Sequence, residues 1–144
     1  MTIITITTVI LFIILIIWSW HSLEDIEKST KILYLIVEIA ITLIITYVIF
    51  IISQGNIQYP SEEIENSIRT TLILLFAGVN GCILVPYTSK ILAKVKQNEI
   101  DSKELRRKIL VILVLIILIV LVEKNYMADT QDGILKVFNQ LMEK

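Results

Sequence analysis

Residues 32–52 have the sequence ILYLIVEIAITLIITYVIFII, and Glu38 is the only charged residue among these 21. A transmembrane helix needs about 20 consecutive, predominantly apolar residues. The run is too long for a strand and shows no alternation of apolar and polar residues. It therefore predicts a helix that crosses a membrane.

Three further apolar segments lie outside this stretch. Residues 2–20 and 70–89 have a similar length, whereas residues 109–122 form an uncharged run of only 14. The short run has no polar face to present to water, and the basic side chains just before it can extend to the bilayer surface. We therefore expect an all-α fold, an integral membrane four-helix bundle. Its spans cover about residues 2–20, 32–52, 67–90 and 107–126, within a four-span membrane domain of residues 1–128.

The composition agrees with this class of protein. Of the 144 residues, 56% are hydrophobic and 19% are charged, and the mean hydropathy is +0.79. A soluble domain has about 45–50% apolar and about 25% charged residues. The composition excludes a disordered chain and a disulfide scaffold, and the net charge of −1 argues against a nucleic-acid partner. The first 20 residues lack a basic start and a small-residue cleavage site, so we expect a span there rather than a signal peptide.

The charges of the connections predict the orientation. The connection over residues 90–108 carries seven basic residues, whereas residues 53–68 carry none and include three glutamates. Because cytoplasmic loops are rich in Lys and Arg, we expect a multi-pass protein of the cell membrane with the basic connection in the cytoplasm and both termini outside. We also expect the basic side chains to attract anionic lipid headgroups. They are Lys90, Lys94, Lys96, Lys103, Arg106, Arg107 and Lys108.

Local signals mark helix ends in these connections. Ser61, followed by two glutamates, is typical of a helix start, because serine caps free amides and acidic residues favour the positive end of the helix dipole. Asp101 with Glu104 resembles a capping box. Two helices would then extend past the bilayer as a cytoplasmic helical hairpin, with Pro86 kinking or breaking the first of them.

The last residues have a pattern of their own. Residues 129–144 are expected to form an amphipathic C-terminal tail, whose helix begins near Asp132. Five apolar residues at helical spacing share one face: Ile134, Leu135, Phe138, Leu141 and Met142.

A polar stripe follows the second apolar segment. Tyr34, Glu38, Thr42 and Thr46 are four residues apart and therefore share one helix face. A charge at the bilayer centre costs at least about 2.5–3.5 kcal/mol, so such a stripe faces protein or water rather than lipid. One interpretation is a glutamate that ties helices together. The other is a proton or cation site, or the wall of a pore.

A second polar residue, Asn80, lies among small residues. Ala77 and Gly81 are four residues apart, as are Gly78 and Cys82, and this spacing lets helices approach closely. We expect these four residues to pack against a helix, and Asn80 to form a hydrogen bond across the contact or to line a pathway.

The third apolar segment also holds the donors that we expect for Glu38. We predict that Glu38 points toward this segment or a symmetry mate, with Asn80 and Tyr87 as candidate donors.

The sequence contains no known catalytic arrangement. Cys82 and His21 are the only cysteine and histidine, too few for a structural zinc site or a Ser/His/Asp set. Glu38 is the only ionisable residue that we place within the membrane, and one carboxyl alone rarely forms a catalytic site. We therefore expect no enzyme, no catalytic residues, no cofactor and no bound metal.

The leading functional hypothesis is a non-enzymatic membrane subunit that assembles, senses or anchors, as a homo-oligomer or with other membrane subunits and with membrane lipids as partners. The alternative is a small ion channel or a proton- or cation-coupled transporter that uses Glu38 with Thr42, Thr46 and Asn80.

Overall fold

The computed structural model describes residues 2–55 and 57–143, and its regular structure over these ranges is entirely helical. The prediction of an all-α fold of four helices is confirmed. The helices are α1 (Thr2–Ser22), α2 (Lys28–Ser53), α3 (Glu62–Lys96) and α4 (Ser102–Met142).

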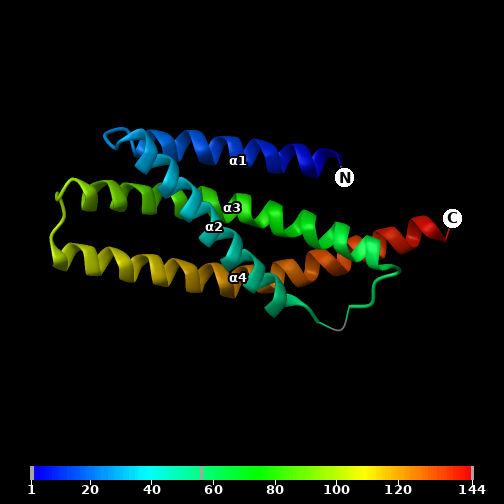
Figure 1. The fold of residues 1–144 in the computed structure, drawn as a ribbon. Helices are drawn as coiled ribbons and strands as arrows, with labels where there is room; N and C mark the ends of the chain where they lie inside the picture. Colours follow the sequence, from blue (N-terminus) through cyan, green and yellow to red (C-terminus); the bar gives the residue numbers. More distant parts are fainter. Residues whose placement is uncertain (1, 56, 144) are drawn as a thin grey trace.

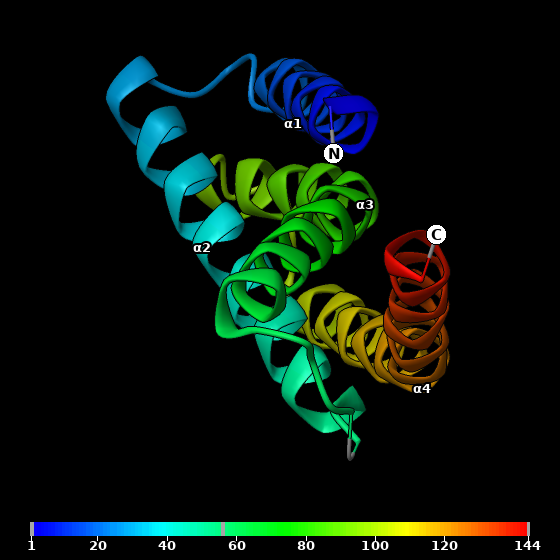
Figure 2. The same cartoon turned by 90° about the vertical axis from the view of Figure 1, so that its right-hand side faces the viewer.

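Helix α3 is the centre of the arrangement. It contacts each of the other three helices, whereas no contact joins α1 to α4 over the described residues. Figure 2 shows α1 and α4 on different sides of α3, with α2 beside it. In Figure 1, α1 and α3 run in the same direction, α4 runs back beside α3, and α2 crosses them obliquely.

Two apolar clusters hold the helices together. One contains Leu15 and Leu23 with Leu35 and Val85, and it joins α1, α2 and α3. The other contains Phe50, Leu72 and Met127 with Ile49, and it joins α2, α3 and α4. Each cluster involves three helices, so α2 and α3 are packed at both ends while α1 and α4 are each packed in one cluster only.

The predicted helix starts at Ser61 and Asp101 are confirmed. The Ser61 hydroxyl accepts a hydrogen bond from the backbone amide of Ile64 at 3.3 Å, and the Asp101 carboxylate accepts one from the amide of Glu104 at 2.7 Å. The carboxylate of Glu104 lies 3.5 Å from the Lys108 ammonium, so only the Asp101 half of the capping box is supported by a described contact. Asn98, with φ at 54°, reverses the chain between α3 and α4; asparagine is one of the few residues that tolerate this left-handed conformation.

Two expectations concern helix continuity. Helix α3 continues through Pro86, so the proline does not break it, and the alternative of a kink there stays a prediction. Helix α4 continues to Met142, so the expectation of a separate helix that begins near Asp132 is wrong. Gly133 costs a helix only about 1 kcal/mol and the segment has no proline, while an ion pair of 2.7 Å between Asp132 and Lys136 supports this turn.

Within the described part of the chain, two helices are long and apolar enough to cross a membrane: α2 and α3. Over the described residues α1 contributes a shorter apolar helix, Ile6–Ser22, and α4 carries its charges close to a short apolar run. The other two spans that the sequence predicts therefore stay predictions.

Candidate functional site

Three residues of the polar stripe on α2 are buried between helices. They are Glu38, Thr42 and Thr46. The Thr42 hydroxyl donates to the backbone oxygen of Glu38 and the Thr46 hydroxyl to that of Thr42, both at 2.9 Å. Tyr34 is half-buried and packs against the apolar cluster that contains Leu15 and Val85. The polar part of the stripe therefore begins at Glu38.

Glu38 points into the protein, toward α3. Its side chain is 7% exposed, and its Oε2 atom accepts a hydrogen bond from the buried hydroxyl of Ser89 at 2.7 Å. The Oε1 atom is buried and has no hydrogen-bond partner among the described residues. One of the two carboxylate oxygens is thus satisfied and the other is not.

The donors expected for Glu38 are wrong. The described donor is Ser89 rather than Tyr87 or Asn80. Tyr87 lies two residues before Ser89, so its side chain leaves the helix about 200° away from that of Ser89. Asn80 lies nine residues before Ser89, which is about 13.5 Å along the helix axis. Which residue of α3 meets Glu38 depends on how α2 crosses it, and the sequence alone does not give that angle.

Asn80 joins three helices. It is fully buried, and its side-chain amide donates to the Thr46 hydroxyl at 3.1 Å and to Oε2 of Glu123 at 2.9 Å. Thr46 belongs to α2 and Glu123 to α4, so the contact fixes both helices to the middle of α3. The Asn80 Oδ1 atom has no partner among the described residues.

Glu123 is the functional candidate that the sequence analysis missed. It is only 8% exposed, so Glu38 is not the only carboxyl group within the bundle. Next to Lys124 it looks like the charged end of an apolar run. In the structure the buried residues of α4 recur at every fourth position, and Glu123 is the first of them: Glu123, Met127, Gln131 and Leu135.

A further contact ties the loop after α2 to α4. The Tyr59 hydroxyl donates to Oε1 of Gln131 at 2.7 Å. Burial raises the pKa of the Tyr59 phenol, Glu65 raises it further, and Arg69 lowers it. The phenol therefore stays protonated, and able to donate, over the whole neutral range.

The small residues of α3 face α1. A Cβ atom added to Gly78 would lie 3.2 Å from Cβ of Leu11, and one added to Gly81 would overlap Cδ1 of Leu15. Ala77 is buried beside them. The Cys82 thiol lies 3.7 Å from the Leu11 backbone oxygen, which accepts its weak hydrogen bond. The described contacts of these glycines are thus mainly with α1.

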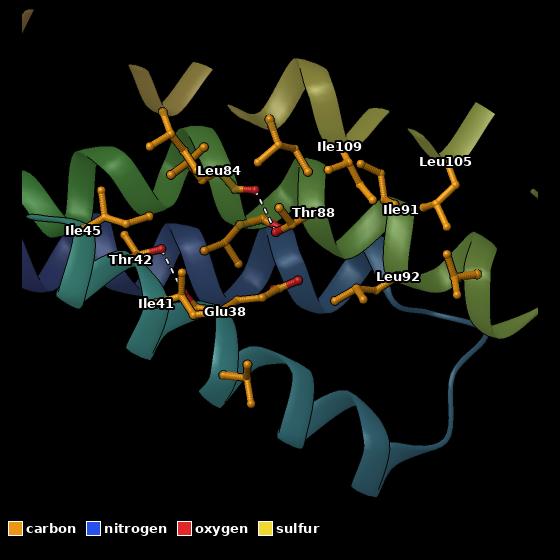
Figure 3. Close-up of a pocket in the computed structure, with 15 residues that line it drawn as sticks. Glu38, Ile41, Thr42, Ile45, Leu84, Thr88, Ile91, Leu92, Leu105 and Ile109 are labelled. Atoms are coloured by element: carbon orange, nitrogen blue, oxygen red, sulfur yellow. Dashed lines mark hydrogen bonds between the residues drawn. The ribbon is translucent and has the colours of Figure 1, made fainter. Parts of the chain in front are cut away.

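A cavity of about 460 Å³ lies between α2, α3 and α4 (Figure 3). Most of its walls are aliphatic, and its polar side chains are Glu38, Thr42 and Thr88. The aliphatic residues come from all three helices: Val37, Ile41, Ile45, Leu84, Val85, Ile91, Leu92, Val95, Leu105, Ile109, Ile112 and Ile116.

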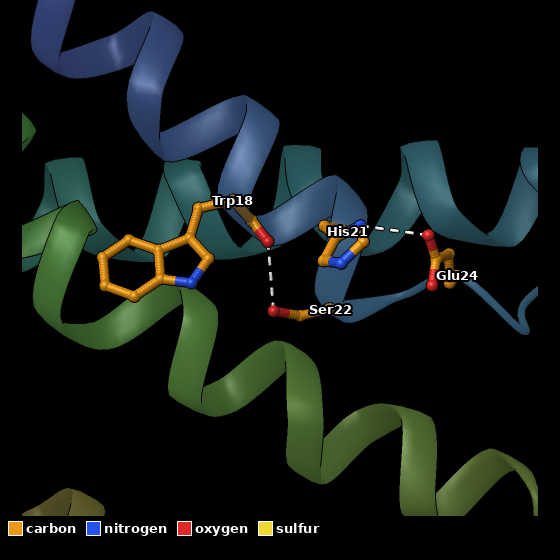
Figure 4. A network of polar contacts seen from close by, with 4 residues as sticks. All are labelled: Trp18, His21, Ser22 and Glu24. Carbon is orange, nitrogen blue, oxygen red and sulfur yellow. Dashed lines mark hydrogen bonds and ion pairs between the residues drawn. The ribbon is translucent and has the colours of Figure 1, made fainter.

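The connection between α1 and α2 carries surface contacts. His21 lies 3.0 Å from Glu24, and the Ser22 hydroxyl donates to the Trp18 backbone oxygen at 3.0 Å (Figure 4). The Lys31 side chain at the start of α2 is instead buried, and its ammonium lies 4.5 Å from the centre of the Trp20 ring. His21 and Glu24 are both exposed, whereas Glu38 is buried, and the described ion-pair partner of His21 is Glu24.

The basic residues of the connection between α3 and α4 lie at the surface. Lys90, Lys96, Lys103, Arg106 and Arg107 are exposed, and Lys94 and Lys108 are half-buried. The segment that carries them, residues 90–108, lies at one end of the bundle (Figure 1).

The chain matches no protein-family model, no curated protein and no solved structure in the comparisons made.

Proposed function

We propose that this protein is a small integral membrane protein that acts as a non-enzymatic subunit of a membrane assembly. The observation that carries the proposal is the pair of long apolar helices, α2 and α3, around which the other two are packed. Apolar side chains such as Ile36, Ile44 and Ile83 point outward from these helices, where a bilayer would surround them.

The arrangement of the ends supports a four-span topology. In Figure 1 both termini and the loop between α2 and α3 lie at one end, and the connections after α1 and α3 lie at the other. The connection after α3 is part of residues 90–108, which carry seven basic residues. The loop between α2 and α3, at the end where the termini lie, is part of residues 53–68, which carry three glutamates and no basic residue. The charge difference favours a cytoplasmic location for the basic end, where its side chains would attract anionic lipids.

The open packing of the bundle supports an assembly. Over the described residues helix α4 meets α2 and α3 but not α1, and it presents large apolar side chains such as Leu110, Leu113 and Ile117 outward. A bundle of this kind offers more apolar surface than one chain covers. We expect further copies, or helices of another membrane subunit, to pack there.

Membrane extraction and mass measurement test this proposal. The protein should stay in the membrane pellet at alkaline pH and enter solution only with detergent. In mild detergent, light scattering should give a protein mass of at least twice the 16.5 kDa of one chain, or a stable complex with another subunit. Release at alkaline pH would contradict membrane integration, and a lone monomer at every concentration would contradict assembly.

A second candidate function is a channel or a proton- or cation-coupled transporter. The buried polar groups between α2, α3 and α4 favour it, because Glu38, Thr42, Thr46 and Asn80 lie in the same helix interfaces. Glu38→Gln keeps most hydrogen bonds and removes the charge. Loss of ion flux into proteoliposomes with unchanged assembly would support ion handling, and the absence of flux in the unaltered protein would exclude it.

A further inference from the structure

The cavity between α2, α3 and α4 has one charged group on its wall. Its volume of about 460 Å³ falls within the range of about 300–1,000 Å³ that is common for small-molecule sites. Among its described lining residues Glu38 is the only ionisable one, and the others are aliphatic except for two threonines. An apolar body and one positive charge are therefore the features that a matching ligand needs.

Glu38 lacks a counter-charge in this structure. Its Oε2 atom receives the Ser89 hydroxyl, and its buried Oε1 atom receives no donor among the described residues. No Lys, Arg or His side chain belongs to the described cavity wall. Burying a carboxylate without a cation or a full set of hydrogen-bond donors costs free energy. A cation beside Oε1 would therefore stabilise the buried Glu38 carboxylate.

The threonines do not fill this need. The Thr42 hydroxyl donates to the backbone oxygen of Glu38, and the Thr88 hydroxyl donates to the backbone oxygens of Leu84 and Val85. Neither hydroxyl donates to Oε1 in a described hydrogen bond, so this oxygen can accept a hydrogen bond from a ligand.

We propose that this cavity binds a hydrophobic amine, whose protonated nitrogen donates to Oε1 of Glu38 while its hydrocarbon part contacts the aliphatic walls. Ile41 of α2, Leu84 of α3 and Ile109 of α4 line the cavity on its three sides (Figure 3). The proposal concerns binding by one chain and does not depend on the oligomeric assembly proposed above. If the transporter function also holds, it supplies a substrate class for it.

Binding is tested with dodecylamine on the full chain in phosphatidylcholine nanodiscs, whose zwitterionic headgroups do not concentrate cations. Isoleucine methyl groups are labelled for NMR, and dodecan-1-ol serves as the neutral ligand of the same length. We expect saturable shifts at Ile41 and Ile109 with the amine, and at least about tenfold weaker binding of the alcohol, as a hydrogen bond to a charged group implies.

Two variants separate the charge from the fold. Glu38→Gln should weaken amine binding by about tenfold or more and make it similar to alcohol binding. Glu123→Gln is the matched control, because Glu123 is an equally buried carboxyl group of the same helix interfaces but is absent from the cavity wall. Its amine affinity should stay within about twofold of the unaltered protein.

A third variant keeps the test decisive if Glu38→Gln does not fold. Ile109→Trp leaves the carboxylate intact and fills the cavity, so it should abolish the saturable shifts at Ile41. Equal affinity for amine and alcohol would overturn the proposal in favour of an acyl-chain groove. Equal loss in Glu38→Gln and Glu123→Gln, or no saturable shift in the unaltered protein, would also overturn it, whatever the oligomeric state.

Discussion

Among single residues, Asn80 joins three helices through the two hydrogen bonds of its side-chain amide. Its amide reaches a threonine of α2 and a glutamate of α4, and its removal would leave the Glu123 carboxylate buried without that donor. We predict that Asn80→Ala lowers the free energy of unfolding by about 1–3 kcal/mol. Thermal unfolding in mild detergent, followed by circular dichroism, measures this. The exposed Asn125 of α4 provides the control, since Asn125→Ala should be neutral or slightly stabilising. Equal midpoints for the two variants would count against the role of Asn80.

Single residues also show what the sequence could predict. Glu38 and Asn80 stand out because each is a polar residue within an apolar run, and the direction of Glu38 toward α3 follows from the cost of placing a carboxyl group in lipid. Ser89 and Glu123 do not stand out in this way. Serine is common on any helix, and Glu123 stands beside Lys124 at the end of its run. Their roles depend on the crossing of helices far apart in the chain.

The contact between α1 and α3 leads to a prediction about whole elements. Leucine at Gly81 would need the space that the Leu15 side chain fills, so we predict that Gly81→Leu separates α1 from α3 and lowers the unfolding midpoint. The double variant Gly81→Leu with Leu15→Ala should recover part of the loss, since it reopens that space. Gly133→Leu is the control: nothing lies within 4 Å of a Cβ at that position, and helix propensity there should improve by up to about 1 kcal/mol. Similar destabilisation by both leucines would show that the close approach is unimportant.

The loop after α2 gives a second prediction at this scale. Tyr59→Phe removes the hydrogen bond to Gln131, and we expect it to cost about 0.5–1.5 kcal/mol and to speed amide hydrogen exchange in residues 57–61. Because the folded state raises the pKa of the Tyr59 phenol, the contribution of this bond is fully present below the ordinary value of about 10 and falls as the pH rises through the raised pKa.

Tyr126→Phe is the matched control for this prediction, because Tyr126 is exposed on α4. It should leave both the stability and the exchange rates unchanged. If Tyr59→Phe behaved in the same way at neutral pH, the loop would not be held by Gln131.

The helices themselves were partly predictable. The starts at Ser61 and Asp101 follow from local capping chemistry, which acts over three residues and is visible in the sequence. The continuity of α4 was not predicted, because an apolar face in residues 134–142 can belong equally to a new helix or to the end of a long one. Burial of Gln131 and Leu135 against the rest of the bundle decides between the two, and that burial is a tertiary property.

For the whole molecule, the distribution of charge predicts the orientation in the membrane. Gln97 lies in the exposed basic connection and Gln58 in the exposed loop at the opposite end. In a Cys82→Ala background, we predict that Gln58→Cys reacts with an impermeant maleimide in intact cells and that Gln97→Cys reacts only after permeabilisation. The reverse pattern would invert the topology.

The same assay tests whether α4 crosses the membrane. Asn139 is exposed near the end of α4, beyond the apolar run. If α4 spans the bilayer, Asn139→Cys should react in intact cells as Gln58→Cys does. Reaction only after permeabilisation would place the tail in the cytoplasm and leave three spans.

The whole fold was predictable in class and not in arrangement. Four long apolar or capped segments in 144 residues leave little alternative to four helices. The central place of α3, the lack of described contacts between α1 and α4, and the parallel course of α1 and α3 depend on which helix faces fit best. The small residues from Ala77 to Cys82 indicated a close partner for α3, and the structure adds that this partner is α1.

Because α1 packs on α3, it has to wait during synthesis until its partner helix has been made. Sixty-six positions separate Leu15 from Gly81, the glycine against which it lies. At a synthesis rate of about 5–20 residues per second, roughly 3–13 seconds pass between the two. Throughout that interval the first helix has left the ribosome without its partner, and its leucine face is available to any other helix or chaperone nearby. Variants that delay the arrival of the glycine face should therefore lower the yield of folded protein even where the finished molecule is equally stable.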